Sequence, residues 1–88
     1  MSNDKWAIYF IGPINPTVKR SRERYIITAT YYLIRWAEAK AVKDCSVVTT
    51  VRFIFENIIN RFGCPRILMS DQGSHFLNNT IEALVKEF

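Results

Sequence analysis

The sequence predicts an α/β fold: three antiparallel strands, then a helix, a fourth strand and a second helix. Three observations favour this order. Runs of β-branched and aromatic residues come first, a stretch with helical periodicity follows, and a short apolar run separates that stretch from a second amphipathic one. The first helix is long enough for a crossover connection, which would lay the fourth strand parallel to the first.

Three segments in the first half of the chain are typical of strands. Residues 6–11 (WAIYFI) form the first, and Gly12-Pro13 predicts the turn that ends it. Residues 25–34 (YIITATYYLI) are apolar at both odd and even positions, as in an internal strand covered on both faces. Residues 35–42 (RWAEAKAV) read as a third strand, although Ala, Glu and Lys would equally allow a helix. The short links between the three segments imply an antiparallel meander.

Residues 46–62 carry the clearest helical pattern. Ser46 is placed to cap the N-terminus, Gly63 suits the positive φ that often ends a helix, and Pro65 forbids continuation. Apolar residues recur along one face at steps of three and four: Val47, Val51, Ile54, Phe55, Ile58 and Phe62. This face is expected to pack against the sheet.

The short strand over residues 66–70 delivers a single carboxylate, Asp71, into a turn that contains Gly73. A lone acid at such a strand end suits a metal-binding or phosphate-handling site. Asp also caps turns for purely structural reasons, and that alternative stays open. The second helix is expected to begin at Asn79 or Thr80.

Composition bounds the possible functions. The 88 residues are enough for one domain (1–88), 49% of them are hydrophobic, and the net charge of +4 permits nucleic-acid binding without requiring it. Cys45 and Cys64 lack CxxC spacing and are expected to be buried thiols of a reducing compartment, nuclear or cytoplasmic. The N-terminus is polar and no apolar run approaches about 18 residues, so neither a signal peptide nor a membrane span is expected.

Four blocks of the sequence together resemble a known family. They are Trp6–Pro13, Tyr31–Ala39, Arg61–Pro65 and Ser70–Phe76. In this order they resemble the integrase catalytic core of gypsy-type LTR retrotransposons, a relative of retroviral integrases with an RNase H-like fold. The resemblance implies a mixed five-stranded sheet flanked by helices. It also implies DNA 3′-end processing and strand transfer, with two Asp and one Glu holding two Mg²⁺ or Mn²⁺ ions.

The sequence departs from that family at two of the three acids. Tyr9 stands where the family has its first catalytic Asp, and a phenol is neutral near pH 7 and a poor Mg²⁺ ligand. The catalytic Glu of the family lies on a later helix, and Glu82 and Glu87 come too early to replace it. Asp71 is therefore the one remaining catalytic and metal-binding candidate. The chain is expected to be an inactive, truncated copy that lacks the C-terminal part of the fold and binds Mg²⁺ or Mn²⁺ weakly or not at all.

Two other functions stay open. A residual nucleic-acid-binding module would use Lys19 and Arg20 for phosphates, with Ser74 and His75 beside the acidic turn, and would bind DNA weakly and without specificity. The basic run 19–24 has a solvated hairpin bend as its ordinary alternative. An interaction remnant would instead self-associate into a homo-oligomer, because the fourth strand would be an unpaired edge and both helices would be partly uncovered.

Overall fold

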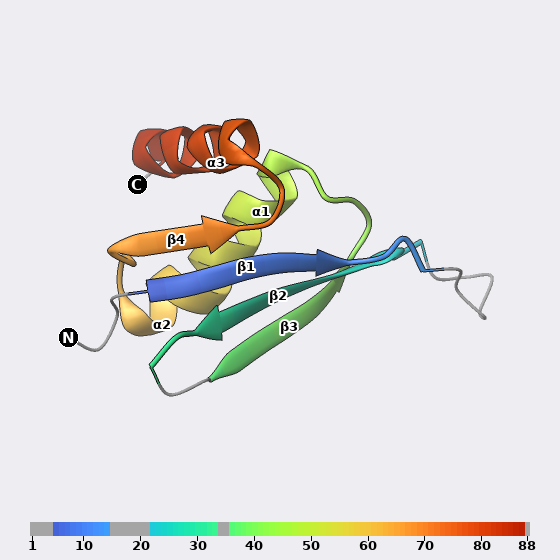
Figure 1. The fold of residues 1–88 in the computed structure, drawn as a ribbon, viewed down its shortest axis with the longest axis horizontal. Coiled ribbons are helices and arrows are strands. Elements are labelled where there is room, and N and C mark those ends of the chain that lie inside the picture. The colour runs from blue at the N-terminus through green and yellow to red at the C-terminus, as the bar shows by residue number, and fades with distance from the viewer. Residues whose placement is uncertain (1–4, 15–21, 34–35, 88) are drawn as a thin grey trace.

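The computed structural model describes residues 5–14, 22–33 and 36–87. Its elements follow the order β1 (Lys5–Ile11), β2 (Tyr25–Tyr31), β3 (Ala37–Val42), α1 (Val47–Ile54), η1 (Phe55–Ile59), α2 (Asn60–Phe62), β4 (Ile67–Ser70) and α3 (Ser74–Glu87). Figure 1 shows one sheet with α1 and α2 behind it and α3 next to β4. No described helix is long and apolar enough to cross a membrane.

The four strands form a mixed sheet in the order β3-β2-β1-β4. β1 pairs with β2 and β2 with β3 in antiparallel fashion, whereas β4 lies parallel to β1. The predicted α/β class, the meander and the parallel fourth strand are therefore confirmed. The segment that could have been a helix is strand β3, because its backbone completes the ladder along β2.

The predicted end of the second strand is wrong. β2 stops at Tyr31, and Tyr32 and Leu33 form a turn. The Tyr31 N–H donates to the Trp36 carbonyl at 2.7 Å, which closes the hairpin before the apolar run has ended. Tyr32 and Leu33 are exposed. These two apolar residues therefore belong to the turn and do not extend the strand.

The predicted start of the last helix is also wrong. α3 begins at Ser74, directly after the acidic turn, because the Gly73 carbonyl accepts from the Leu77 N–H at 3.1 Å. Phe76 anchors this first turn by packing edge-on against Phe10, with ring centroids 6.3 Å apart. Thr80 lies inside the helix, where its hydroxyl donates to the Phe76 carbonyl at 2.9 Å.

The long helix predicted over residues 46–62 is confirmed, with a wide π turn at Phe55–Ile59 that the sequence did not reveal. Ser46 is the N-cap, and its Oγ accepts from the Thr49 N–H at 3.2 Å. The π turn changes the helical phase of the residues after it, and Phe62, inside the predicted stripe, is 40% exposed. Phe53, which precedes the π turn and is outside the predicted stripe, is buried at 2% exposure.

The core lies between the sheet and the helices. Alternate strand residues point to the helix side, where they meet the buried residues of the long helix. The members of this cluster are Trp6, Ile8, Ile27, Ala29, Tyr31, Phe53, Ile54 and Ile58. Trp6 is 1% exposed and stacks on Tyr31 with ring centroids 5.3 Å apart, while Phe62 contacts it at 5.4 Å.

Two expectations about burial are wrong. β2 is internal in the sheet, but helices cover only one of its faces, and Thr28 and Thr30 on the other face are half-buried. The two cysteines are free but not buried. Cys45 is half-buried and Cys64 is exposed, since both lie in loops that flank the long helix.

Asp44, just before the long helix, organises the helix start. Its Oδ1 accepts from the Thr49 hydroxyl at 2.6 Å, the Ser46 hydroxyl at 2.7 Å and the Ser46 N–H at 3.0 Å. Hydrogen bonds lower the pKa of Asp44 from its usual 3.8 to about 2. The Thr49 hydroxyl contributes most, the two Ser46 donors come next, and Arg52 adds a smaller electrostatic attraction. The carboxylate form is thus the one that the fold prefers.

Because the pKa of Asp44 is lower in the folded chain, its contribution to stability is complete above pH 3.8 and is lost as the pH falls through about 2. We expect Asp44→Asn to lower the midpoint of thermal unfolding near pH 6 and to flatten its fall between about pH 4 and pH 2. Thr49→Val, which removes the strongest partner, should reproduce part of that flattening. Circular dichroism melts across this range provide the measurement, and parallel curves for Asp44→Asn and the wild type would contradict the prediction.

Candidate functional site

The pairing of β1 with β4 defines the candidate site. Its register runs from Lys5 opposite Ile67 to Ile8 opposite Ser70. The ladder ends at that pair, so Tyr9 in β1 and Asp71, in the bend that follows β4, are each one residue beyond it. The two positions singled out in the sequence therefore both lie at the carboxyl end of a parallel strand pair.

Tyr9 lies on the sheet face that the helices leave open. Its side chain is 40% exposed, and by alternation it points away from the core side chains of Ile8 and Phe10. On the other side of β1 its register partner is Thr28, whose hydroxyl donates to the Tyr9 carbonyl at 3.4 Å. No core packing depends on the phenol, so the position tolerates other side chains.

The turn after β4 is held by Ser70 and Gly73. The Ser70 Oγ accepts from the Gln72 N–H at 3.2 Å, and Gly73 adopts a φ of 93° that other residues rarely adopt. No atom lies within 4 Å of where a Gly73 Cβ would stand, so conformation and not space requires glycine. The exposed Asp71 carboxylate accepts a hydrogen bond from the side-chain amide of Gln72 at 3.3 Å. The backbone of the turn is thus fixed by its neighbours.

The donor set at this end of the sheet does not fit a divalent cation. Mg²⁺ and Mn²⁺ prefer several anionic oxygen ligands, and Asp71 supplies one carboxylate beside a phenol and a hydroxyl. Within residues 5–14, 22–33 and 36–87, no three acidic, His or Cys side chains are grouped to hold a metal ion. Glu82, further along α3, is exposed and pairs with Lys86 at 3.8 Å.

The candidate nucleic-acid contacts divide into two groups. Ser74 and His75 are exposed in the first turn of α3, immediately after the Asp71 turn, so these three residues lie together. Lys19 and Arg20 lie outside the described residues. From the same basic run, Arg24 is exposed beside the end of β1, where its carbonyl accepts from the Ile14 N–H at 2.7 Å. Arg24 is thus close to the residues that follow β1, on the side of β2.

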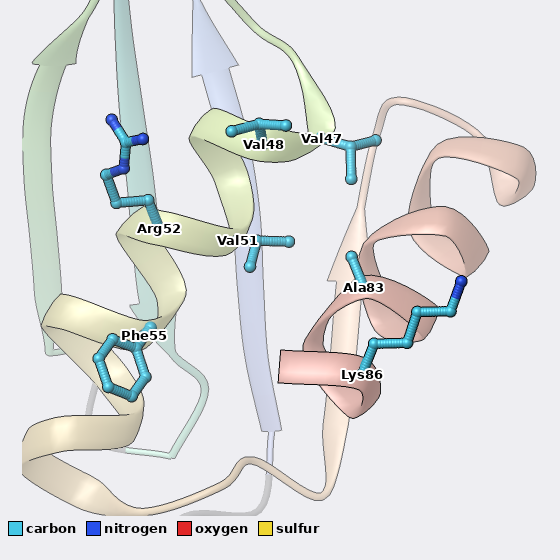
Figure 2. Close-up of a pocket in the computed structure, with 7 residues that line it drawn as sticks. All are labelled: Val47, Val48, Val51, Arg52, Phe55, Ala83 and Lys86. Atoms are coloured by element: carbon cyan, nitrogen blue, oxygen red, sulfur yellow. The ribbon is translucent and has the colours of Figure 1, made fainter. Parts of the chain in front are cut away.

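Two hollows lie away from this end of β1 and β4. Figure 2 shows the residues that line a groove between α1 and α3. Its volume is about 400 Å³, and its charged lining residues are Arg52 and Lys86. Its apolar lining consists of Val47, Val48, Val51, Phe55 and Ala83. A second apolar hollow of about 450 Å³ lies between β4 and α3 and reaches Cys64. Neither includes Tyr9 or Asp71. This groove was not predicted from the sequence. The helical stripe that includes Val47 and Val51 is the sequence feature that could have indicated it.

Comparison with known proteins shows similarity to retroviral polyproteins. The chain is 31% identical over 68 residues to the Gag-Pol polyprotein of Woolly monkey sarcoma virus and, equally, to that of Koala retrovirus. The matched region is 77% of this chain and about 4% of each polyprotein, so the chain spans a small part of these relatives. No family model matches the chain. The similarity supports an origin of the retroviral type.

Proposed function

We propose that the chain is part of an integrase catalytic core from a gypsy-type retrotransposon and is catalytically inactive. The activity of that family is metal-dependent DNA 3′-end processing and strand transfer. The observation that supports the proposal is the register of β1 and β4, which ends at Ile8 opposite Ser70, one residue before Tyr9 and Asp71. A working site would need two acids at the latter two positions, and here one of them is a phenol.

Three lines support the assignment. The sequence blocks from Trp6 to Phe76 resemble that family in order and spacing. The mixed sheet, with β4 parallel to β1 after a helical crossover, is compatible with an RNase H-like fold. The similarity to retroviral Gag-Pol polyproteins agrees with a retroelement source.

The first test concerns activity. The pure 88-residue chain is incubated with an oligonucleotide duplex and Mn²⁺, and nicked or joined products are resolved on a denaturing gel. We expect no products, because one carboxylate cannot hold the ions that activate the attacking oxygen. Asp71→Asn serves as the control for contaminating nucleases. Products made by the wild type but not by Asp71→Asn would overturn the proposed inactivity.

The second test restores the acid pair. Tyr9→Asp would add a carboxylate at the end of β1 near the Asp71 bend, and we expect calorimetry to detect weak Mn²⁺ binding that the wild type lacks. Thr28→Asp is the matched control, since it adds the same charge on the far side of position 9, about two strand spacings from Asp71. Equal binding by the two variants, or none by Tyr9→Asp when it is folded, would show that these positions do not form the site.

Nucleic-acid binding without catalysis is a second candidate function. The observation that favours it is the position of Ser74 and His75, both exposed next to Asp71. Arg24 and Lys43 are exposed where β2 begins and β3 ends, and the Arg24 N–H donates to the Val42 carbonyl at 3.0 Å. The net charge of the chain, +4, suits contact with a phosphate backbone more than with a specific base sequence.

Binding of this kind should weaken steeply with salt. We expect fluorescence anisotropy with a labelled duplex to show weak affinity whose logarithm falls by about 0.9 per phosphate contact for each decade of salt. Replacing Lys19 and Arg20 together by Gln should make the salt dependence less steep, by the equivalent of about two phosphate contacts. Lys86→Gln on α3 should leave the slope unchanged. Undetectable or salt-independent binding would remove this candidate function.

A further inference from the structure

The end of the sheet opposite Asp71 carries a group of exposed hydrophobic side chains, and we call it the hydrophobic end. β1, β3 and β4 begin there, β2 ends there, and the end of α2 lies beside them (Figure 1). Its large hydrophobic side chains, between 40% and 64% exposed, are Tyr32, Leu33, Trp36, Phe62 and Ile67. Exposed hydrophobic residues that stand singly are common on proteins, whereas such a group at one end indicates a contact surface.

Contacts around Lys5 join the first half of this group. The Lys5 carbonyl accepts from the Tyr32 N–H at 3.0 Å, and the Lys5 ammonium lies 4.6 Å from the centre of the Tyr32 ring. Lys5 is also opposite Ile67 in the ladder between β1 and β4. Leu33 follows Tyr32 in the turn after β2. The start of β1 therefore connects the turn on one side with the start of β4 on the other.

A second chain of contacts joins the other half. The Trp36 indole N–H donates to the Glu38 carboxylate at 3.1 Å, and the same carboxylate pairs with Arg61. The Arg61 guanidinium lies 5.4 Å from the centre of the Phe62 ring, which in turn packs against Trp6 at 5.4 Å. Trp6 directly follows the lysine at the start of β1, so the two halves form one surface.

Cations accompany these hydrophobic side chains, and the acid among them is mostly covered. Lys5 and Arg61 each contact an aromatic ring of the group, and Arg66 is exposed directly before Ile67. The Glu38 side chain is 16% exposed, whereas that of its partner Arg61 is 49% exposed. The hydrophobic end therefore presents apolar groups and positive charge, and complementarity requires a partner that is both apolar and anionic.

We propose that the hydrophobic end docks on an anionic lipid bilayer. The five hydrophobic side chains enter the boundary between headgroups and acyl chains, where Trp and Tyr are favoured, and the cations meet lipid phosphates and carboxylates. Two donors at this end need no water, because the Trp36 indole N–H is bonded to Glu38 and the Tyr32 N–H to the Lys5 carbonyl. Entry into an apolar layer thus leaves these two donors paired.

The contacts favour a lipid surface over other anionic partners. Single-stranded nucleic acid stacks its bases on open ring faces, but Lys5 lies over the Tyr32 ring, and Phe62 contacts two other groups. An acidic peptide helix would need an apolar groove, and neither the α1–α3 groove nor the β4–α3 hollow is lined by any of the five side chains. This inference goes beyond the proposed function and does not depend on it.

The test is flotation of the wild-type chain with lipid vesicles. At low salt we expect binding to vesicles of phosphatidylcholine mixed with phosphatidylserine, little binding to phosphatidylcholine alone, and weaker binding as salt is added. Leu33→Gln should weaken binding to the mixed vesicles about tenfold and Lys5→Gln about fivefold. Val48→Gln and Lys86→Gln make comparable changes at exposed positions on α1 and α3 and should bind as the wild type does.

Several outcomes of the flotation experiment would overturn the proposal. They are a wild type that does not float with the mixed vesicles, equal binding to neutral and mixed vesicles, and equal losses in the control variants and the variants of the hydrophobic end. Binding of a labelled single-stranded oligonucleotide that Leu33→Gln abolishes, without any vesicle binding, would assign this end to nucleic acid instead.

Acrylamide quenching of tryptophan fluorescence tests the wild type without any substitution. Trp36 is 46% exposed and Trp6 is 1% exposed, so Trp36 accounts for most of the quenching. We expect the mixed vesicles to reduce the quenching and neutral vesicles to leave it unchanged, because docking covers the Trp36 ring. Unchanged quenching of a chain that floats with the mixed vesicles would show that another surface binds the lipid.

Discussion

The parallel pairing of β1 with β4 is the constraint on which the rest of the structure depends. It requires the long helix as a crossover, and the packing of that helix under the strands provides the core. Trp6 joins these parts, because it is opposite both Tyr31 and Leu68 in the sheet and contacts Phe62 at the helix end. The same pairing fixes the register that places Tyr9 and Asp71 at the same end of the sheet. Fold and candidate site therefore have one physical origin.

Sequence reasoning was strongest where a pattern is local and repeated. The strand runs, the long amphipathic stretch and its Ser46 cap follow from side-chain periodicity and hydrogen-bonding capacity, and the structure confirms them. The parallel direction of β4 also followed, because the length of a crossover limits the geometry. The neighbourhood of positions 9 and 71 could thus be predicted before any coordinates.

What sequence reasoning missed depends on tertiary contacts. The early start of α3 relies on Phe76 packing against Phe10, a residue far away in the chain. The end of β2 at Tyr31 is set by a hydrogen bond to Trp36, and nothing in the run of apolar residues signals it. The uncovered face of the sheet, opposite α1 and α2, was not predicted for a related reason. Apolar residues on both faces of a strand predict two covered faces, but alternation alone cannot tell a covered face from an uncovered one.

The wide turn at Phe55–Ile59 has a consequence for the geometry around Trp6. Each residue of a regular helix advances the side-chain direction by about 100°, so one extra residue within a helix rotates everything after it. Phe62 follows this turn and reaches the Trp6 ring. A relative shortened by one residue here would keep a continuous helix but would swing its last aromatic ring off the tryptophan. The π turn therefore sets the rotation of the helix end relative to the first strand.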